Sequence, residues 1–116
     1  MKRFPADSPV RDVRWVGRTA VVDVEGDVDL SRAPGFQQSL LAVLDRRPQR
    51  LVVNLADVPY MDSAGVASLV KLLSRTRKQN VGLRLAGMGE RVRSIFEITR
   101  LDTVFDIYPD EKEALV

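Results

Sequence analysis

Carboxylates and one serine are the residues of this chain best suited to chemistry. Asp27 and Asp29 are close neighbours, and Asp62 and Ser63 are adjacent. A serine at the start of a helix lies near free N–H groups and the positive end of the helix dipole, where an added phosphate is stabilised. Paired carboxylates are also the groups that acid–base catalysis or a magnesium ion would use. The two chemistries to weigh are therefore phosphorylation of Ser63 and catalysis at the aspartates.

Catalysis is disfavoured by the residue types that the chain lacks. It contains no cysteine and no histidine, which removes thiol nucleophiles, imidazole bases and the usual zinc sites. Ser63 does not fit a hydrolase nucleophile, because the nucleophile elbow needs glycine two residues earlier and Met61 occupies that position. No other residue completes a catalytic site around Asp27 and Asp29. We therefore expect no enzyme, cofactor or metal site, although composition alone leaves a carboxylate-held magnesium ion or a lysine base open.

The serine lies where a strand gives way to a helix. Residues 51–55 are short and almost unbroken apolar, which is typical of a strand covered on both faces. From residue 66 onward the apolar spacing changes to i, i+3, i+4, i+7, which predicts a helix over 64–79. Asp62 and Ser63 fall at the junction, where either side chain can cap the helix. Capping is the alternative to a functional role for each residue, and for Asp62 the two roles are compatible.

The rest of the chain is also predicted to alternate between strands and helices. Strands are expected at 10–16, 19–25, 81–85 and 103–107, and helices are expected to start near Ser31, to bury a face over 92–99 and to start at Pro109. This ββαβαβαβα order predicts an α/β domain with a mixed sheet and helices packed against it. In open α/β sheets the loops at the carboxyl ends of the strands form the functional edge. The loops 26–30 and 56–63 are expected to lie there.

Composition fits a single soluble domain. The chain has 116 residues, 45% hydrophobic and 29% charged, and we expect a flexible arm over 1–9 before a domain over 10–116. Its net charge is +2 with only 6% aromatic residues, so we expect no nucleic-acid partner. No apolar run approaches the ~18 residues of a membrane span, and the N-terminal residues do not resemble a signal peptide. We therefore expect a cytoplasmic protein without membrane insertion.

Several segments together resemble one known family. The residues Tyr60-Met61-Asp62-Ser63-Ala64-Gly65-Val66 resemble the signature of STAS domains of the bacterial anti-sigma factor antagonist type. The segment 26–30 is similar to the family's loop after its second strand, and the segment 86–105 is similar to its C-terminal half. The resemblance runs from about Thr19 to Leu115, which is nearly the whole chain.

The resemblance implies a phosphorylation switch. In this family the unphosphorylated protein binds an anti-sigma factor that is also a serine kinase of the histidine-kinase-like ATPase fold, and this binding frees the sigma factor. The kinase phosphorylates the serine after the motif's aspartate, and a serine phosphatase reverses the modification. By position that serine is Ser63 here. The family's partner-binding surface maps onto the residues around it: Asp27, Asp29, Asp62, Ala64 and Gly65.

Two other functions stay open. The chain can be a STAS subunit of a lipid or anion transport complex, in which the same edge docks on an ATPase without phosphorylation. It can also be a small-molecule or nucleotide-binding regulator, although Gly87-Met88-Gly89 lacks the third glycine of a dinucleotide motif. The fold of the ATPase that the protein binds would distinguish a transport subunit from an anti-sigma factor antagonist. Ligand-dependent melting would test the small-molecule regulator.

The chain departs from the family pattern at two positions. Ala64 stands where regulatory members often carry serine or threonine, which leaves a single candidate hydroxyl. Arg100 replaces the glycine of the family's Thr-Gly-Leu at the end of the third helix. If the chain folds back there through a left-handed cap, Arg100 adopts a positive φ that glycine would adopt without penalty.

Overall fold

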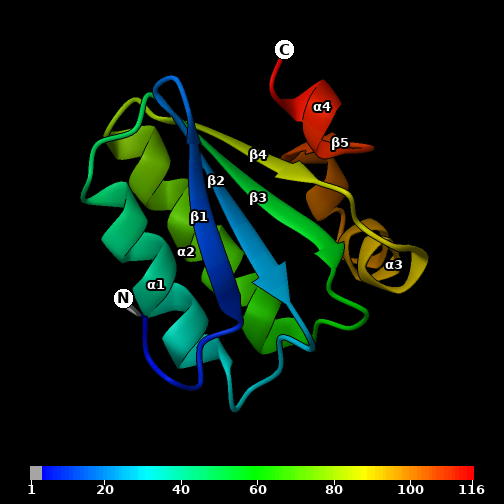
Figure 1. The fold of residues 1–116 in the computed structure, drawn as a ribbon. Coiled ribbons are helices and arrows are strands. Elements are labelled where there is room, and N and C mark those ends of the chain that lie inside the picture. The colour runs from blue at the N-terminus through cyan, green and yellow to red at the C-terminus, as the bar shows by residue number, and fades with distance from the viewer. Residues whose placement is uncertain (1–3) are drawn as a thin grey trace.

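Five strands form one mixed sheet in the computed structural model, which describes residues 4–116 (Figure 1). The strands lie side by side in chain order: β1 (Val10–Val16), β2 (Thr19–Glu25), β3 (Arg50–Asp57), β4 (Gly82–Ala86) and β5 (Asp106–Tyr108). The β1–β2 pair is antiparallel and the other three pairs are parallel. The predicted mixed sheet is confirmed.

The helices connect the strands in the predicted order. They are α1 (Ala33–Leu44), α2 (Ser63–Lys78), α3 (Glu90–Ile98) and the short α4 (Glu111–Ala114), with a 3₁₀ turn, η1, over Leu101–Thr103. Figure 1 shows α1 and α2 together behind the sheet, and α4 beside β5. The main core lies between the sheet and the helices α1, α2 and α3, and its fully buried side chains include Phe36, Leu40, Leu51 and Leu69. Helix α4 belongs to a second, smaller cluster, in which Ala114 packs with Val21 and Val52.

Three predicted element boundaries are wrong. Helix α4 begins at Glu111 with Asp110 at its N-cap, two residues after the predicted start at Pro109. The last strand is shorter and later than predicted, because Leu101–Thr103 forms η1 and the chain pairs with β4 only from Asp106. Helix α1 begins at Ala33 with Arg32 at its cap, so Ser31 is not the N-cap. The Ser31 hydroxyl instead donates to the Asp29 carboxylate at 2.7 Å, and the Asp29 carbonyl accepts the N–H of Ala33 at 2.9 Å. Asp29 therefore shapes the entry to α1.

Residues 4–9 contact the domain. The Ser8 and Ser39 hydroxyls are hydrogen-bonded at 2.7 Å, and the N–H of Glu25 donates to the Pro9 carbonyl at 2.9 Å. The division of the chain at residue 9 stays a prediction, and residues 1–3 of the proposed arm lie outside the described residues. Within residues 4–116, no helix is both long and apolar enough to cross a membrane.

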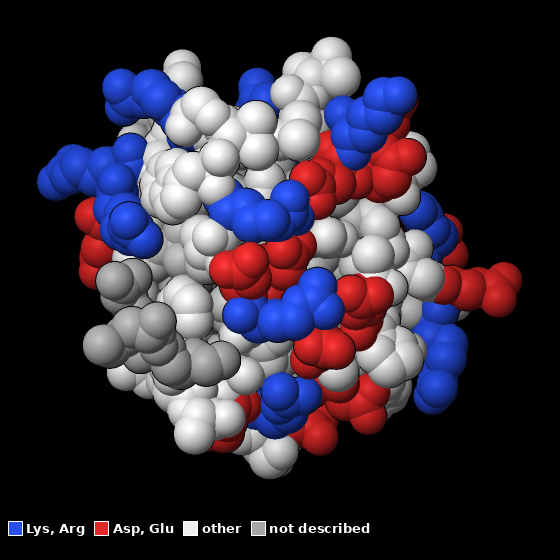
Figure 2. Space-filling view, viewed as in Figure 1, with Lys and Arg blue, Asp and Glu red and all other residues white. Residues whose placement is uncertain are grey.

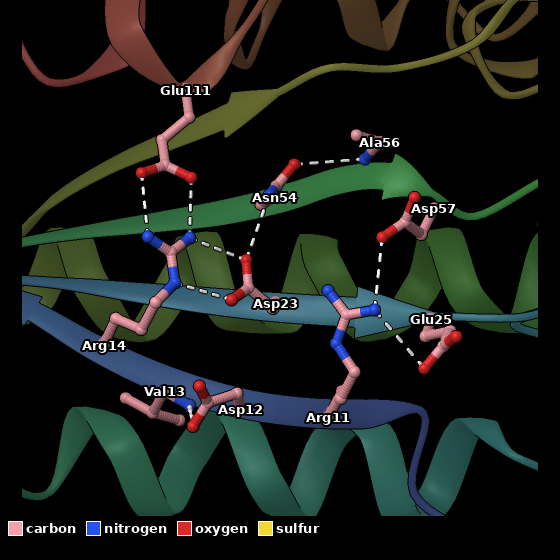
Figure 3. A network of polar contacts seen from close by, with 10 residues as sticks. All are labelled: Arg11, Asp12, Val13, Arg14, Asp23, Glu25, Asn54, Ala56, Asp57 and Glu111. Atoms are coloured by element: carbon pink, nitrogen blue, oxygen red, sulfur yellow. Dashed lines mark hydrogen bonds and ion pairs between the residues drawn. The ribbon is translucent and has the colours of Figure 1, made fainter.

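A polar network covers the sheet face that lies away from α1 and α2 (Figure 3). The Arg14 guanidinium on β1 donates to both carboxylate oxygens of the buried Asp23 on β2, at 2.6 and 2.8 Å. It also donates to both carboxylate oxygens of Glu111 on α4, at 3.0 and 2.6 Å. Asn54 on β3 donates a further bond to Asp23 at 3.0 Å. Arg14 thus links β1 to the C-terminal helix across the sheet.

This network predicts a pH dependence of stability. The hydrogen bonds from Arg14 hold the pKa of the Asp23 carboxyl below its usual range, although burial opposes this. Ionised Asp23 therefore stabilises the fold above the ordinary aspartate pKa of about 3.9, and this contribution is lost as pH falls through the lower folded pKa. We expect Asp23→Asn to lower the free energy of unfolding by roughly 1–3 kcal/mol at about pH 7.

Urea unfolding across pH measures this effect. The difference between Asp23→Asn and wild type should shrink below about pH 4, because the wild-type carboxylate is then being protonated. Asp106→Asn, an exposed aspartate on β5, is the control and should change little at any pH. A constant difference between Asp23→Asn and wild type down to acid pH would show that the ion pair does not supply this stability.

The predicted strain at Arg100 is present. Arg100 has φ 63° and lies between the end of α3 and η1, in the left-handed region. This conformation costs an arginine ~1 kcal/mol or more, whereas its exposed charge near the helix end returns ~0.3–1 kcal/mol. We expect Arg100→Gly to raise the melting temperature by roughly 2–4 °C in a thermal scan.

Ser94→Gly is the matched control for that variant, because Ser94 is exposed in the middle of α3. Glycine there should lower the melting temperature, since it lacks the helix propensity of serine. A lower melting temperature for Arg100→Gly as well would mean that a contact of the arginine outweighs the strain.

Candidate functional site

The two loops that the sequence places at the functional edge are joined by backbone hydrogen bonds. The β2–α1 loop and the β3–α2 loop form a parallel bridge between Val28 and Met61. The N–H of Val28 donates to the Tyr60 carbonyl at 3.0 Å, and the N–H of Asp62 donates to the Val28 carbonyl at 3.1 Å. The predicted site residues of the two loops therefore share one edge of the sheet.

Asp62 holds this edge together. Its Oδ1 accepts the N–H groups of Ala64 at 2.9 Å and Gly65 at 3.3 Å, which makes Asp62 the N-cap of α2. Its Oδ2 accepts the N–H of Leu30 in the other loop at 3.0 Å. One carboxylate thus caps a helix and fixes a neighbouring loop, so the capping role of Asp62 is confirmed.

Ser63 is the first residue of α2 and is exposed. The alternative in which Ser63 is only a helix cap is wrong, because Asp62 occupies the cap position. Among the described residues, no hydrogen-bond partner holds the Ser63 hydroxyl. Beyond the Asp62 cap, the first turn of α2 carries no acidic side chain, so an anion on Ser63 would share the positive end of the helix dipole with the Asp62 carboxylate. The geometry suits a phosphoacceptor.

Gly65 is in the first turn of α2 and is buried. A Cβ at this position would be 2.8 Å from the Val28 carbonyl oxygen and 2.7 Å from the Met61 Cγ. Only glycine allows α2 to approach the paired loops this closely. Burial favours a packing role for Gly65 over the predicted partner contact, and Ala64, which is half-buried, is the more accessible of the two.

Asp29 and Asp27 differ in what their carboxylates do. Asp29 Oδ1 accepts the Ser31 hydroxyl at 2.7 Å and the N–H of Arg32 at 3.2 Å. The bond from Ser31 is the main cause that holds the Asp29 pKa below its usual range, so the group is anionic at neutral pH. Asp27 is exposed, and it is its backbone carbonyl that accepts a bond from Arg32, at 3.1 Å.

Two exposed apolar side chains on these loops were not predicted as site residues. Leu30 is 75% exposed and Tyr60 is 38% exposed, and they come from the two loops that the bridge joins. The Arg91 guanidinium lies over the Tyr60 ring, 5.5 Å from its centroid. Apolar contacts beside charged ones are typical of protein interfaces. The sequence signal that could have identified Leu30 and Tyr60 is one apolar residue inside each loop that fits neither strand nor helix periodicity.

The fold and the site define the class of protein. Residues 11–114 match the family model described as the STAS domain, and the chain belongs to this family. Curated relatives of the chain are named anti-sigma-B factor antagonists. One of them, the anti-sigma-B factor antagonist of Bacillus subtilis strain 168, is 31% identical over 96 residues, which cover 83% of this chain and 87% of the relative.

Solved structures agree with this assignment. An anti-sigma factor antagonist from Mycobacterium paratuberculosis has a TM-score of 0.86 and 29% identity, covering 97% of this chain and 96% of that one. The Bacillus cell fate determinant SpoIIAA in its phosphorylated form has a TM-score of 0.69 at 18% identity, covering 90% of this chain and 95% of that one. The second likeness shows a shared fold.

Proposed function

We propose that this protein is a phospho-regulated antagonist of an anti-sigma factor in the cytoplasm. Unphosphorylated, it binds an anti-sigma factor that is also a serine kinase of the histidine-kinase-like ATPase fold, and it thereby frees a sigma factor. Phosphorylation of Ser63 ends this binding, and a serine phosphatase restores it. Asp29, Asp62 and Ala64 contribute to the surface that the partner contacts.

The proposal rests on the different positions of Asp62 and Ser63 at the start of α2. Asp62 caps α2, which leaves the adjacent Ser63 exposed with a hydroxyl that makes no bond within the described residues. Phosphate adds about −1.5 to −2 charges at pH 7, and the start of α2 can accept them because the helix dipole favours an anion. Phosphorylation of Ser63 would therefore change the charge of this surface and leave the Asp62 cap of α2 in place.

The relatives support the same function. The Bacillus subtilis relative is named as an anti-sigma-B factor antagonist, and a SpoIIAA structure of the same fold is of a phosphorylated form. The names of the curated relatives describe sigma-factor control. A transport subunit is supported only by a likeness of fold, to a sulfate transporter family protein from Wolinella succinogenes with a TM-score of 0.72 at 18% identity. The transport alternative is therefore the weaker one.

Phosphate mapping tests the proposed modification. The protein is incubated with the anti-sigma factor kinase of its own organism and ATP, and the product is analysed by intact mass and peptide mapping. We expect one phosphate, on Ser63, in the wild type and in Ser31→Ala, and none in Ser63→Ala. Ser31 is the informative control because it is also exposed on the same edge. Phosphate on another residue would remove the basis of the switch.

Asp29→Ala is expected to lower partner affinity more than stability. An anionic carboxylate next to the exposed Leu30 can pair with a partner donor, and truncating such a contact commonly costs about 30-fold or more in affinity. The local bonds to Ser31 and Arg32 are exposed or half-buried, so the melting temperature should change by only a few degrees. Calorimetric titration against the kinase measures the affinity.

Asp27→Ala is the control for charge alone, because it removes a carboxylate from the same loop. It should have a smaller effect, since no hydrogen bond of the described residues uses the Asp27 side chain. Equal losses from the two variants would mean that the loop's charge, and not a specific contact of Asp29, attracts the partner.

A further inference from the structure

The charges of this protein are separated along the strand direction. The two loops at the Ser63 edge, over 25–30 and 57–62, contain five acidic residues and no basic residue, and Arg11 on β1 pairs with two of the five, Glu25 and Asp57. Three loops and helix ends meet at the opposite end of the sheet, over 15–19, 45–49 and 75–81, and they contain a single acidic residue, Asp45. Six exposed basic residues gather there, and we call them the basic end: Arg18, Arg46, Arg47, Arg75, Arg77 and Lys78.

The basic end is one continuous surface. The N–H of Gln49 donates to the Arg18 carbonyl at 2.9 Å, and the N–H of Gly82 donates to the Gln49 carbonyl at 3.2 Å. A depression of about 500 Å³ lies between these loops, and its lining includes Arg18, Arg47 and Asn80. Figure 2 shows blue side chains gathered at the upper left, the end where the β1–β2 turn lies in Figure 1.

These cations are available to a ligand. The four ion pairs of the described residues involve only Arg11 and Arg14 as cations, so none of the basic end is neutralised by a partner in residues 4–116. The eight residues of β3 span roughly 26 Å, several times the Debye length of about 8 Å at physiological salt. An anion approaching the basic end therefore responds to that end and not to the acidic edge.

Exposed apolar side chains adjoin the basic end. Trp15 is 39% exposed and Val16 is 49% exposed, at the tip of the β1–β2 hairpin. The Arg46 guanidinium lies over the Trp15 ring, 5.3 Å from its centroid, so one face of the ring is already covered. Nucleic-acid binding would use an open ring face for stacking. A tryptophan beside arginines suits the headgroup level of a phospholipid surface, where amphipathic rings and basic side chains concentrate.

We propose that the basic end docks peripherally on an anionic phospholipid surface, with Trp15 and Val16 at the headgroup level. The Ser63 edge is at the other end of the strands, so it faces away from the lipid and stays open to a protein partner. Arg47 fits this role: it has φ 57°, a value that glycine adopts without penalty, yet the chain places a cation there. This inference is independent of whether Ser63 is phosphorylated.

Vesicle binding tests the proposal with the full chain. We expect flotation with vesicles of phosphatidylcholine containing roughly a third phosphatidylserine, no flotation with phosphatidylcholine alone, and weaker binding as salt rises. Trp15 is the only tryptophan, so its fluorescence reports on the hairpin tip directly and should shift to shorter wavelength on binding. Absence of flotation at low salt, or flotation without a shift, would overturn the proposal.

Charge reversal locates the surface. Arg18→Glu with Arg77→Glu should weaken vesicle binding about 30-fold or more, because each basic residue near an anionic surface contributes about five-fold. Lys71→Glu with Lys112→Glu makes the same change in net charge at exposed residues outside the basic end, and it should have little effect. Equal losses in the two double variants, or a preference of the wild type for single-stranded RNA over the vesicles, would contradict the docking surface proposed here.

Discussion

Ser63→Asp is expected to weaken binding to the anti-sigma factor kinase at least about 100-fold, with little change in melting temperature. The substituted carboxylate would lie beside Asp62 on an edge whose loops already contain five acidic residues. A partner that fits a neutral hydroxyl would have to bury this charge without a counterion, which costs about 3 kcal/mol or more. The start of α2 tolerates the charge in the free protein because it is the positive end of the helix dipole.

Calorimetric titration and a thermal scan measure the two quantities. Ser63→Ala should bind like the wild type, since it keeps the position neutral. Ser74→Asp is the matched control, because Ser74 is an exposed serine on the same helix but near its other end. Normal affinity of Ser63→Asp, or an equal loss of affinity in Ser74→Asp, would show that Ser63 is not part of the surface that the partner contacts.

Gly65→Ala is expected to cause the largest loss of stability among single methyl additions. The new Cβ would lie 2.8 Å from the Val28 carbonyl oxygen, and a backbone atom cannot move aside as a side-chain tip can. Either α2 shifts or the bridge between Val28 and Met61 opens, and overpacking of this kind costs roughly 1–3 kcal/mol. Urea unfolding measures the loss, and partner affinity should fall with it because both site loops move.

Gly89→Ala is the control for a glycine-to-alanine change as such. A Cβ at Gly89 meets no atom within 4 Å, and its φ of −74° suits alanine. Its effect should stay below about 1 kcal/mol, which is the small advantage of glycine over alanine at the N-cap of α3. If Gly65→Ala were equally mild, the contact between α2 and the paired loops would not be as tight as the structure indicates.

Much of the site could be predicted because its elements have strong local patterns. The apolar run 51–55 and the helical spacing after residue 66 define β3 and α2, and the strand-to-helix order then brings the loops 26–30 and 56–63 to one edge. The left-handed Arg100 was also predictable, since a helix pattern ends there and apolar character resumes at once. These features depend on short stretches of sequence.

Other features depend on contacts between residues that no sequence pattern connects. Arg14 and Glu111 are 97 positions apart, and their ion pair exists only because the sheet and α4 bring them together. Asp62 and Ser63 are both good capping residues, and only the extended backbone at Asp62 decides between them. The exposure of Leu30 and Tyr60 likewise follows from loop geometry and not from periodicity.

A displacement assay tests the central claim most directly. The sigma factor is bound to the anti-sigma factor kinase, and the protein is added either unphosphorylated or after complete phosphorylation mapped to Ser63. We predict that the unphosphorylated protein displaces the sigma factor and that the phosphorylated protein does not. Displacement by both forms alike, or by neither, would contradict a switch at Ser63.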